Sequence, residues 1–444
     1  MTEPSSATAS TSGESESKSP RSLRAAPALD LVPLPEKPIE PYAEIVGNDV
    51  VEEIAELASQ IEGARVLHLN PTAFGGGVAE LLYALVPLMR SVGLEAEWRL
   101  IHGSEEFFNV TKAAHNGLQG MEVLWTAEME SIYLAKLREN IESWSDSYDF
   151  IVCHDPQTAA MLHLLTEVRG EHPPGKWIWR CHIDTTAPHE PVSNFFKPFI
   201  NEYDAGVFTL DDYVPQGFEP QVAIIPPCID PLAHKNLWMD RRTVTAMLQA
   251  YQIDVERPIA CQISRFDPWK DPLGVIDAYR LAKEEIPGLQ LIMAGSMATD
   301  DPEGWHYFTA TDEHREGDPD IYLLTNMQQV GATQVNAFQR ASDVVLQKSI
   351  REGFALTVAE ALWKETPVIG GRAGGIRLQI VEGETGFLVD SVEECAARLV
   401  DLLKNPEEAT RMGKHGKEHI RKNYLSTNNL RNYLELFVSL NRQA

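Results

Sequence analysis

The chain has 444 residues, of which 43% are hydrophobic and 23% are charged, and it carries a formal net charge of −27 at pH 7. This length exceeds what one small core needs and predicts two domains of ordinary size. The negative charge argues against nucleic acid or an anionic membrane as a partner, and no apolar run approaches the ~20 residues that span a bilayer.

The N-terminus and the cysteines bear on the cell compartment. Residues 1–35 are rich in Ser, Thr, Glu and Pro, which predicts a disordered tail, and they lack the apolar core of a secretory signal. The five cysteines are an odd number without close spacing, so we expect reduced thiols of a cytoplasmic protein. No Cys/His cluster has the spacing of a zinc site.

After this tail, strand-like and helix-like patterns alternate, which indicates a parallel sheet with helices on both faces. A helix is predicted over Val78–Val92, with a kink at Pro87. The predicted strands of this part are Arg65–Asn70, Glu97–His102, Asp149–His154, Lys176–His182, Ala205–Leu210 and Gln221–Ile225.

A proline-rich break at Pro226, Pro227 and Pro231 predicts a boundary between a first domain, residues 36–228, and a second, residues 229–426. The alternation then restarts, and two doubly wound α/β units in tandem would leave a cleft at their strand carboxyl ends, where ligands bind. The predicted strands are Pro258–Ile263, Leu289–Ala294, Ile321–Leu324, Val344–Gln347 and Pro367–Ile369, and helices are predicted at Leu273–Lys283 and from Val392 onward.

The segment KSIREGFALTVAEA places Glu352 in a loop and Glu360 on the helix that follows. Unpaired N–H groups at a helix start suit phosphate or sugar oxygens, and the two carboxylates could bind hydroxyl pairs. On one helix they would lie ~12 Å apart along the axis, which exceeds the ~5–9.5 Å of a glycosidase pair. The alternative gives Glu352 a helix-dipole role and Glu360 a solvated helix face.

The segment SRFDPWKDP follows the first strand of the second domain and ends at a helix start. Arg265 and Lys270 are five residues apart there and could clamp a diphosphate. The alternative is a pair of surface cations near two aspartates. Gly295, at the end of the next strand, faces the same cleft in this interpretation.

Gly75, Gly76 and Gly77 lie between the first strand and the first helix, where glycines let a backbone approach a ligand closely. The alternative is a tight strand-to-helix turn. The nicotinamide fingerprint G-x-G-x-x-G is absent, because Glu80 stands where its last glycine should be.

A histidine and a nearby aspartate end each of two successive strands, as His154-Asp155 and as His182-Ile183-Asp184. Strand carboxyl ends gather binding and catalytic groups in this architecture. A single histidine is more often structural, but the repetition favours a site.

Together, the loop glycines, the SRFDPWKDP cation pair and the E-x7-E segment resemble the retaining GT-B glycosyltransferases of the glycogen-synthase and sucrose-synthase-like group. The resemblance covers about residues 60 to 430. The pieces HLNPTAFGGGVAELL, VCHDPQ and WRCHIDTT are most similar to the trehalose glycosyltransferring synthases, and the retaining trehalose phosphorylases look similar in the same pieces. The resemblance implies an α/β GT-B fold, with two doubly wound Rossmann-like parallel-sheet domains facing across a cleft and a C-terminal helix, residues 427–444, crossing back to the first domain.

The resemblance implies that the second domain binds the nucleotide sugar. Arg265 and Lys270 would hold the diphosphate and stabilise the charge of the leaving group. Glu352 would bind hydroxyls of the donor glucose, and Glu360 would bind those of the ribose. The remaining positions expected to contact this ligand are Gly295, Gly353, Phe354 and Ala355.

The first domain would bind the acceptor. Asp155 would contact the acceptor sugar, and His182 the donor glucose near its 6-hydroxyl, with His154 also in the substrate site. Gly76 and Gly77 would approach the phosphate or the acceptor from this side. The residues expected to act in catalysis are Arg265, Lys270, Glu352 and Asp155.

The implied reaction moves glucose from ADP- or UDP-glucose to C1 of free glucose, giving α,α-trehalose with retained configuration by front-face attack. We expect no cofactor beyond this co-substrate, no obligatory metal and a homodimer. Two alternatives remain: a trehalose phosphorylase, and an inactive GT-B module that senses sugars or nucleotides.

Overall fold

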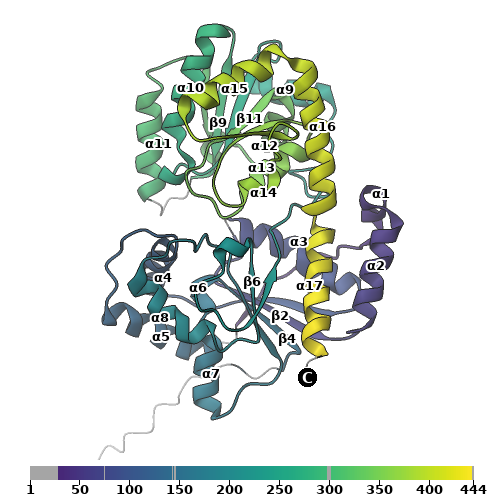
Figure 1. The fold of residues 1–444 in the computed structure, drawn as a ribbon, viewed down its shortest axis with the longest axis vertical. Coiled ribbons are helices and arrows are strands. Elements are labelled where there is room, and N and C mark those ends of the chain that lie inside the picture. The colour runs from purple at the N-terminus through teal and green to yellow at the C-terminus, as the bar shows by residue number, and fades with distance from the viewer. Residues whose placement is uncertain (1–28, 75, 143, 145–146, 298–301, 443–444) are drawn as a thin grey trace, which may run out of the picture.

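The computed structural model describes residues 29–442, except residues 75, 143, 145–146 and 298–301. Figure 1 shows two α/β domains, one built on the strands of the N-terminal half and one on those of the C-terminal half. In the part of the chain so described, no helix combines the length and the apolar character needed to cross a bilayer.

The first domain contains a sheet whose seven described strands run in the order β1-β3-β2-β4-β5-β6-β7. Neighbours pair in parallel, except that β1 runs antiparallel to β3 at the edge. Strands buried on both faces are continuous apolar runs, which explains why the sequence predicts most of them. The strands are β1 (Asp30–Leu31), β2 (Arg65–Asn70), β3 (Glu95–Leu100), β4 (Phe150–His154), β5 (Lys176–Arg180), β6 (Ala205–Phe208) and β7 (Gln221–Ile224).

The second domain contains a parallel sheet whose six described strands run in the order β10-β9-β8-β11-β12-β13. The last strand, with the sequence GFLV, is missing from the prediction. The strands are β8 (Ile259–Ile263), β9 (Gln290–Gly295), β10 (Ile321–Thr325), β11 (Val344–Gln347), β12 (Val368–Gly371) and β13 (Gly386–Val389).

Helices cover both faces of each sheet, so each sheet separates two hydrophobic cores. Successive residues of β2 show this, because Val66 and Leu67 belong to different core clusters. The helices of the first domain are α1 (Ala43–Val46), α2 (Asn48–Ser59), α3 (Gly77–Ser91), α4 (Glu105–Leu118), α5 (Ala127–Ile141), α6 (Asp155–Thr158), α7 (Met161–Arg169) and α8 (Glu190–Ile200). Those of the second are α9 (Arg241–Ala250), α10 (Pro272–Glu285), α11 (Pro302–His314), α12 (Ala332–Ala341), α13 (Leu356–Trp363), α14 (Ile376–Gln379), α15 (Val392–Lys404) and α16 (Pro406–Asn423).

The last helix, α17 (Ser426–Asn441), returns to the first domain, as the GT-B resemblance implies (Figure 1). Its apolar face joins the core of that domain, where the Phe437 and Phe150 rings stack with centroids 4.4 Å apart. Burying a large apolar side chain contributes about 1.5–3 kcal/mol. This helix therefore fixes where the chain ends relative to the first sheet.

The predicted tail of residues 1–35 is too long at its C-terminal end. Residues 1–28 lie outside the described part of the chain, but Leu29 and Val32 are buried. Between them, β1 pairs with Leu100 and Arg99 of β3. The sequence did not reveal this strand because two residues show no periodicity, and their stabilisation comes from the sheet edge that they cover.

Candidate active site

Each sheet has a point where the strand order reverses, and the predicted site loops follow the strands on either side of it. In the second sheet, β8 and β11 are neighbours, and they lead into the loops that carry Lys270 and Glu352. In the first sheet, β2 and β4 lead into the glycine loop and into His154-Asp155. Ligands bind outside the strand carboxyl ends at such switch points.

Lys270 and Glu352 form an ion pair at the switch point of the second sheet. The Lys270 Nζ lies 2.6 Å from Glu352 Oε2, and the side chains are only 15% and 10% exposed. Asp267 caps the 3₁₀ turn Pro268–Lys270, since its Oδ1 accepts hydrogen bonds from the backbone N–H groups of Trp269 and Lys270. The pair thus joins two loops that are far apart in sequence.

Arg265 does not join this pair. Its side chain is 70% exposed and forms an ion pair with Asp267 at 3.1 Å, as the alternative of a surface cation describes. Its charge nevertheless reaches the first domain, because after burial it is the next cause that lowers the pKa of His115, to about 4. The diphosphate role of Arg265 stays a prediction.

The loop between Glu352 and α13 has three successive backbone N–H groups without a hydrogen-bond acceptor among the described residues. Ala355 has a φ of 66° and caps the helix in the left-handed region, which costs a non-glycine residue energy and is common at binding sites. Within the described residues, no hydrogen bond is donated by the N–H groups of Gly353, Phe354 or Ala355. The Phe354 side chain is buried, so only its backbone is available to a ligand.

The first domain holds this loop from the other side. The Tyr213 hydroxyl donates to the Glu352 carbonyl oxygen at 2.8 Å and lies 3.3 Å from that of Gly353. A Cβ atom on Gly353 would stand 2.7 Å from the His182 carbonyl oxygen, so only glycine permits this approach. Gly353 therefore brings the loop of residues 352–355 against the predicted substrate residues of the first domain.

Glycines support both sets of loops. Gly76 has a φ of 136° and precedes α3, and a Cβ atom on Gly77 would lie 3.2 Å from Leu356 Cδ1. The glycine loop of the first domain thus meets the start of α13, while Gly75 lies outside the described residues. At Gly295, a Cβ atom would stand 2.2 Å from the Ser264 carbonyl oxygen, which ties β9 to the Arg265 loop.

Asp155 is 9% exposed and has a φ of 58°. Its Oδ1 accepts a hydrogen bond of 2.7 Å from the His182 backbone N–H. Burial raises the pKa of Asp155 to about 6, and this effect outweighs the hydrogen bond and the nearby Arg180 charge. A carboxylate of this kind could accept a hydrogen bond from a sugar hydroxyl.

His154 requires a correction. Its side chain is 2% exposed, and its Nδ1 and Nε2 atoms are hydrogen bonded to His182 and His68. Burial lowers the pKa of the His154 ring, which is therefore neutral. A buried ring with both nitrogens hydrogen bonded cannot bind a sugar directly. His154 instead contacts His182, which is the predicted substrate residue.

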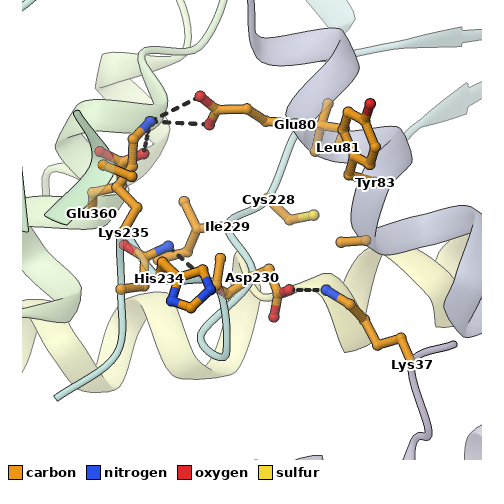
Figure 2. Close-up of a pocket in the computed structure, with 14 residues that line it drawn as sticks. Lys37, Glu80, Leu81, Tyr83, Cys228, Ile229, Asp230, His234, Lys235 and Glu360 are labelled. Atoms are coloured by element: carbon orange, nitrogen blue, oxygen red, sulfur yellow. Dashed lines mark hydrogen bonds and ion pairs between the residues drawn. The ribbon is translucent and has the colours of Figure 1, made fainter. Parts of the chain in front are cut away.

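Glu360 lies apart from the Lys270–Glu352 pair, in a pocket of about 250 Å³ between the domains (Figure 2). Its side chain is 1% exposed, so the alternative of a solvated helix face is wrong. The Lys235 Nζ lies 3.0 Å from Glu360 Oε1 and also contacts both carboxylate oxygens of Glu80, on α3, at 2.9 and 3.1 Å. Gln339 approaches Glu360 Oε2 at 3.5 Å.

Sequence reasoning missed several residues of these sites, namely His68, Tyr213, Lys235 and Ser349. Ser349 donates to Glu352 Oε2 at 3.3 Å and lies within the E-x7-E segment, so its hydroxyl could have been noticed. A histidine inside the apolar run RVLHLN is also a signal, because a buried polar group needs a partner. Nothing in the local sequence marks Tyr213 or Lys235.

Two doubly wound domains with charged and glycine-rich loops at their switch points, and a last helix that returns to the first domain, define a glycosyltransferase of the GT-B fold. Residues 68–215 match the family described as trehalose synthase, N-terminal domain, and residues 244–419 match glycosyl transferases group 1. Among solved structures, "Trehalose-6-phosphate from E. coli bound with UDP-2-fluoro glucose" has a TM-score of 0.69 at 14% identity, covering 86% of this chain and 99% of that one.

Sequence relatives resolve the family. A trehalose synthase of Rubrobacter xylanophilus is 50% identical over 409 residues, which cover 91% of this chain and 97% of that protein. A trehalose synthase of Pyrococcus horikoshii is 47% identical over 90% of this chain and 96% of its own length. A trehalose phosphorylase of Pleurotus pulmonarius is 26% identical over 91% of this chain and 61% of its own length. The chain therefore belongs to the trehalose synthase family and is a hexosyltransferase.

Proposed function

We propose that this enzyme transfers glucose from a nucleotide-diphosphoglucose to C1 of free glucose and so forms α,α-trehalose with retained configuration. The observation that carries the proposal is the Lys270–Glu352 pair, which lies at a switch point beside backbone N–H groups that have no acceptor among the described residues. High identity to proteins named trehalose synthase supports the product. A homodimer and a cytoplasmic location stay predictions.

In the proposed reaction, the bond between the donor C1 and the diphosphate oxygen breaks while the acceptor hydroxyl attacks from the same face. The acceptor proton passes to an oxygen of the leaving diphosphate. Lys270 has three N–H donors, so it can stay bound to Glu352 and still contact the diphosphate. A fixed cation at the leaving group stabilises the charge that develops in the transition state.

The other residues act by positioning. Glu352 and the N–H groups of Gly353 to Ala355 would hold the donor sugar and its phosphate, because free N–H groups at a helix start suit anionic oxygens. Asp155 would orient the acceptor from the opposite domain. Arg265 would turn from Asp267 toward the diphosphate, and Glu360 would bind the ribose. Holding both sugars in reacting geometry lowers the barrier without a protein nucleophile.

The test is an incubation with glucose and either ADP-glucose or UDP-glucose, with the product identified by mass and linkage. Lys270→Ala should lower kcat by about 10²–10³, whereas the surface control Lys422→Ala, at a side chain that is 62% exposed, should match the unmodified enzyme. If no donor yields a non-reducing disaccharide, the proposal fails.

A trehalose phosphorylase is the second candidate, because of the distant similarity to such enzymes. It would split trehalose with inorganic phosphate and release glucose 1-phosphate. Running the assay with trehalose and phosphate, and without nucleotide, separates the two reactions. If the protein binds sugars and nucleotides without turnover, the result would instead favour an inactive GT-B module that senses these ligands.

A further inference from the structure

Three histidine rings form a hydrogen-bonded row from the core of the first domain to the domain junction. His68 lies on β2, His154 ends β4, and His182 follows β5, and these strands are neighbours in the sheet. The His68 Nδ1 lies 3.0 Å from His154 Nε2, and the His154 Nδ1 lies 2.9 Å from His182 Nε2. The His154 and His182 rings are stacked with an interplanar angle of 11°.

Each ring of this row is neutral, because burial lowers the pKa of all three histidines, that of His68 to about 3. A neutral imidazole has one N–H donor and one bare nitrogen. Two hydrogen bonds in a row then permit only two arrangements, which differ in the direction of donation. In one, every ring donates from Nδ1; in the other, every ring donates from Nε2.

The inner end of the row favours the first arrangement. His68 Nε2 is buried and has no hydrogen-bond partner within the described residues. If this nitrogen carried the proton, a buried N–H would be orphaned, and orphaned N–H groups are rarer in proteins than under-satisfied acceptors. His68 therefore carries its proton on Nδ1, and the same order continues through His154 to His182.

The outer end of the row lies at the predicted sugar site. His182 is partly exposed, and its carbonyl oxygen faces Gly353 of the loop of residues 352–355. Its Nε2 is occupied by His154, and its Nδ1 has no hydrogen-bond partner among the residues that the structure describes. No group of three His, Cys, Asp or Glu side chains in that part of the chain could hold a metal ion.

We propose that His68 and His154 are positioning residues that fix His182 as the Nδ1–H tautomer, so that its ring donates a hydrogen bond to a sugar hydroxyl oxygen in the cleft. The sugar as recipient rests on the proposed function, whereas the tautomer does not. A ring with a fixed donor needs no tautomer change when the ligand binds, and this preorganisation favours binding.

The tautomer can be read directly from histidine ¹⁵N–¹H correlation spectra of the ligand-free protein, with His182 assigned from the spectrum of His182→Ala. His68→Leu removes the inner donor, while His68→Asn keeps an amide N–H near the position of Nδ1. His163→Leu serves as a control, because His163 is a surface residue paired with Glu202.

We expect His182 to be protonated on Nδ1 in the unmodified protein, in His68→Asn and in His163→Leu. In His68→Leu we expect a mixture of tautomers and about a fivefold to tenfold loss of kcat/KM, the size of one hydrogen bond. His182 protonated on Nε2 in the unmodified protein, or an unchanged tautomer in His68→Leu, would overturn the proposal. The spectrum of the unmodified protein decides even if His68→Leu fails to fold or the transfer reaction is not found.

Discussion

Replacing Lys235 by methionine tests how Glu360 is held in the pocket between the domains. Lys235 connects Glu360 on α13 to Glu80 on α3, so one ammonium group joins the two domains (Figure 2). Without it, the Glu360 carboxylate keeps only the Gln339 amide, at 3.5 Å, among its described side-chain partners. The buried Lys364 still attracts this carboxylate, but a buried charge that loses its directly paired counter-charge is costly.

The magnitude follows from the exposure of the three groups. Removing one partner of a fully buried ion pair costs about 3–5 kcal/mol. Lys235 is 22% exposed and Glu360 1%, and solvent screens part of the interaction, so we expect Lys235→Met to lower the free energy of unfolding by about 2–3 kcal/mol. Glu80 is 51% exposed, so Glu80→Gln should cost no more than about 1 kcal/mol.

Urea unfolding followed by tryptophan fluorescence measures these differences, provided that a single transition is observed. The double variant Lys235→Met/Glu360→Gln should regain much of the loss, because the unpaired charge is gone. If Glu360 binds the ribose, Lys235→Met should also raise the KM for the donor. Equal losses for Lys235→Met and Glu80→Gln, or a change below about 0.5 kcal/mol for Lys235→Met, would refute this account.

Three further changes probe the cleft and its surroundings. Gly353→Ala should lower kcat/KM by about 10², because the added methyl group moves the loop away from His182. Gly288→Ala is the control, since an added Cβ atom would lie 3.8 Å from its nearest neighbour, and kcat/KM measured for both variants should fall only for Gly353→Ala. Because the pKa of Asp155 is raised to about 6, kcat/KM for the acceptor should rise with pH through about 6, and Asp155→Asn should remove this limb. Burial lowers the pKa of Lys364 to about 7, whereas the ordinary pKa of a lysine is 10.5. Between these two pH values the unfolded chain binds more protons than the folded protein, so the free energy of unfolding should rise with pH. Urea unfolding of Lys364→Met should show a weaker rise.

The parts of this molecule that sequence predicts are those with a local signal. Strands buried on both faces are apolar runs, so β2 and β4 stand out from their surroundings. Loops at strand carboxyl ends follow once the alternation is known, and two such loops after neighbouring parallel strands must lie close together. That Lys270 and Glu352 contact each other also depends on the strand order, which the alternation does not give.

What sequence did not reveal depends on contacts between distant segments. Tyr213 lies 139 residues before Glu352, whose carbonyl oxygen accepts its hydrogen bond, and His68 lies 86 residues before His154. Such pairs have no spacing rule, because the fold and not the local pattern brings them together. For the same reason, His154 looked like a binding residue at a strand end, although its ring lies between two other histidines.

The loop of residues 352–355 belongs to the second domain in sequence but contacts both domains in the structure. Its backbone is fixed by the Tyr213 hydroxyl, by the close approach of Gly353 to His182, and by the contact of Leu356 with Gly77. Each of these contacts crosses the domain boundary. The orientation of the N–H groups that would meet the donor phosphate therefore depends on how the first domain lies against the loop. In the proposed reaction, residues of the first domain would thus influence donor binding through packing alone, without touching the donor.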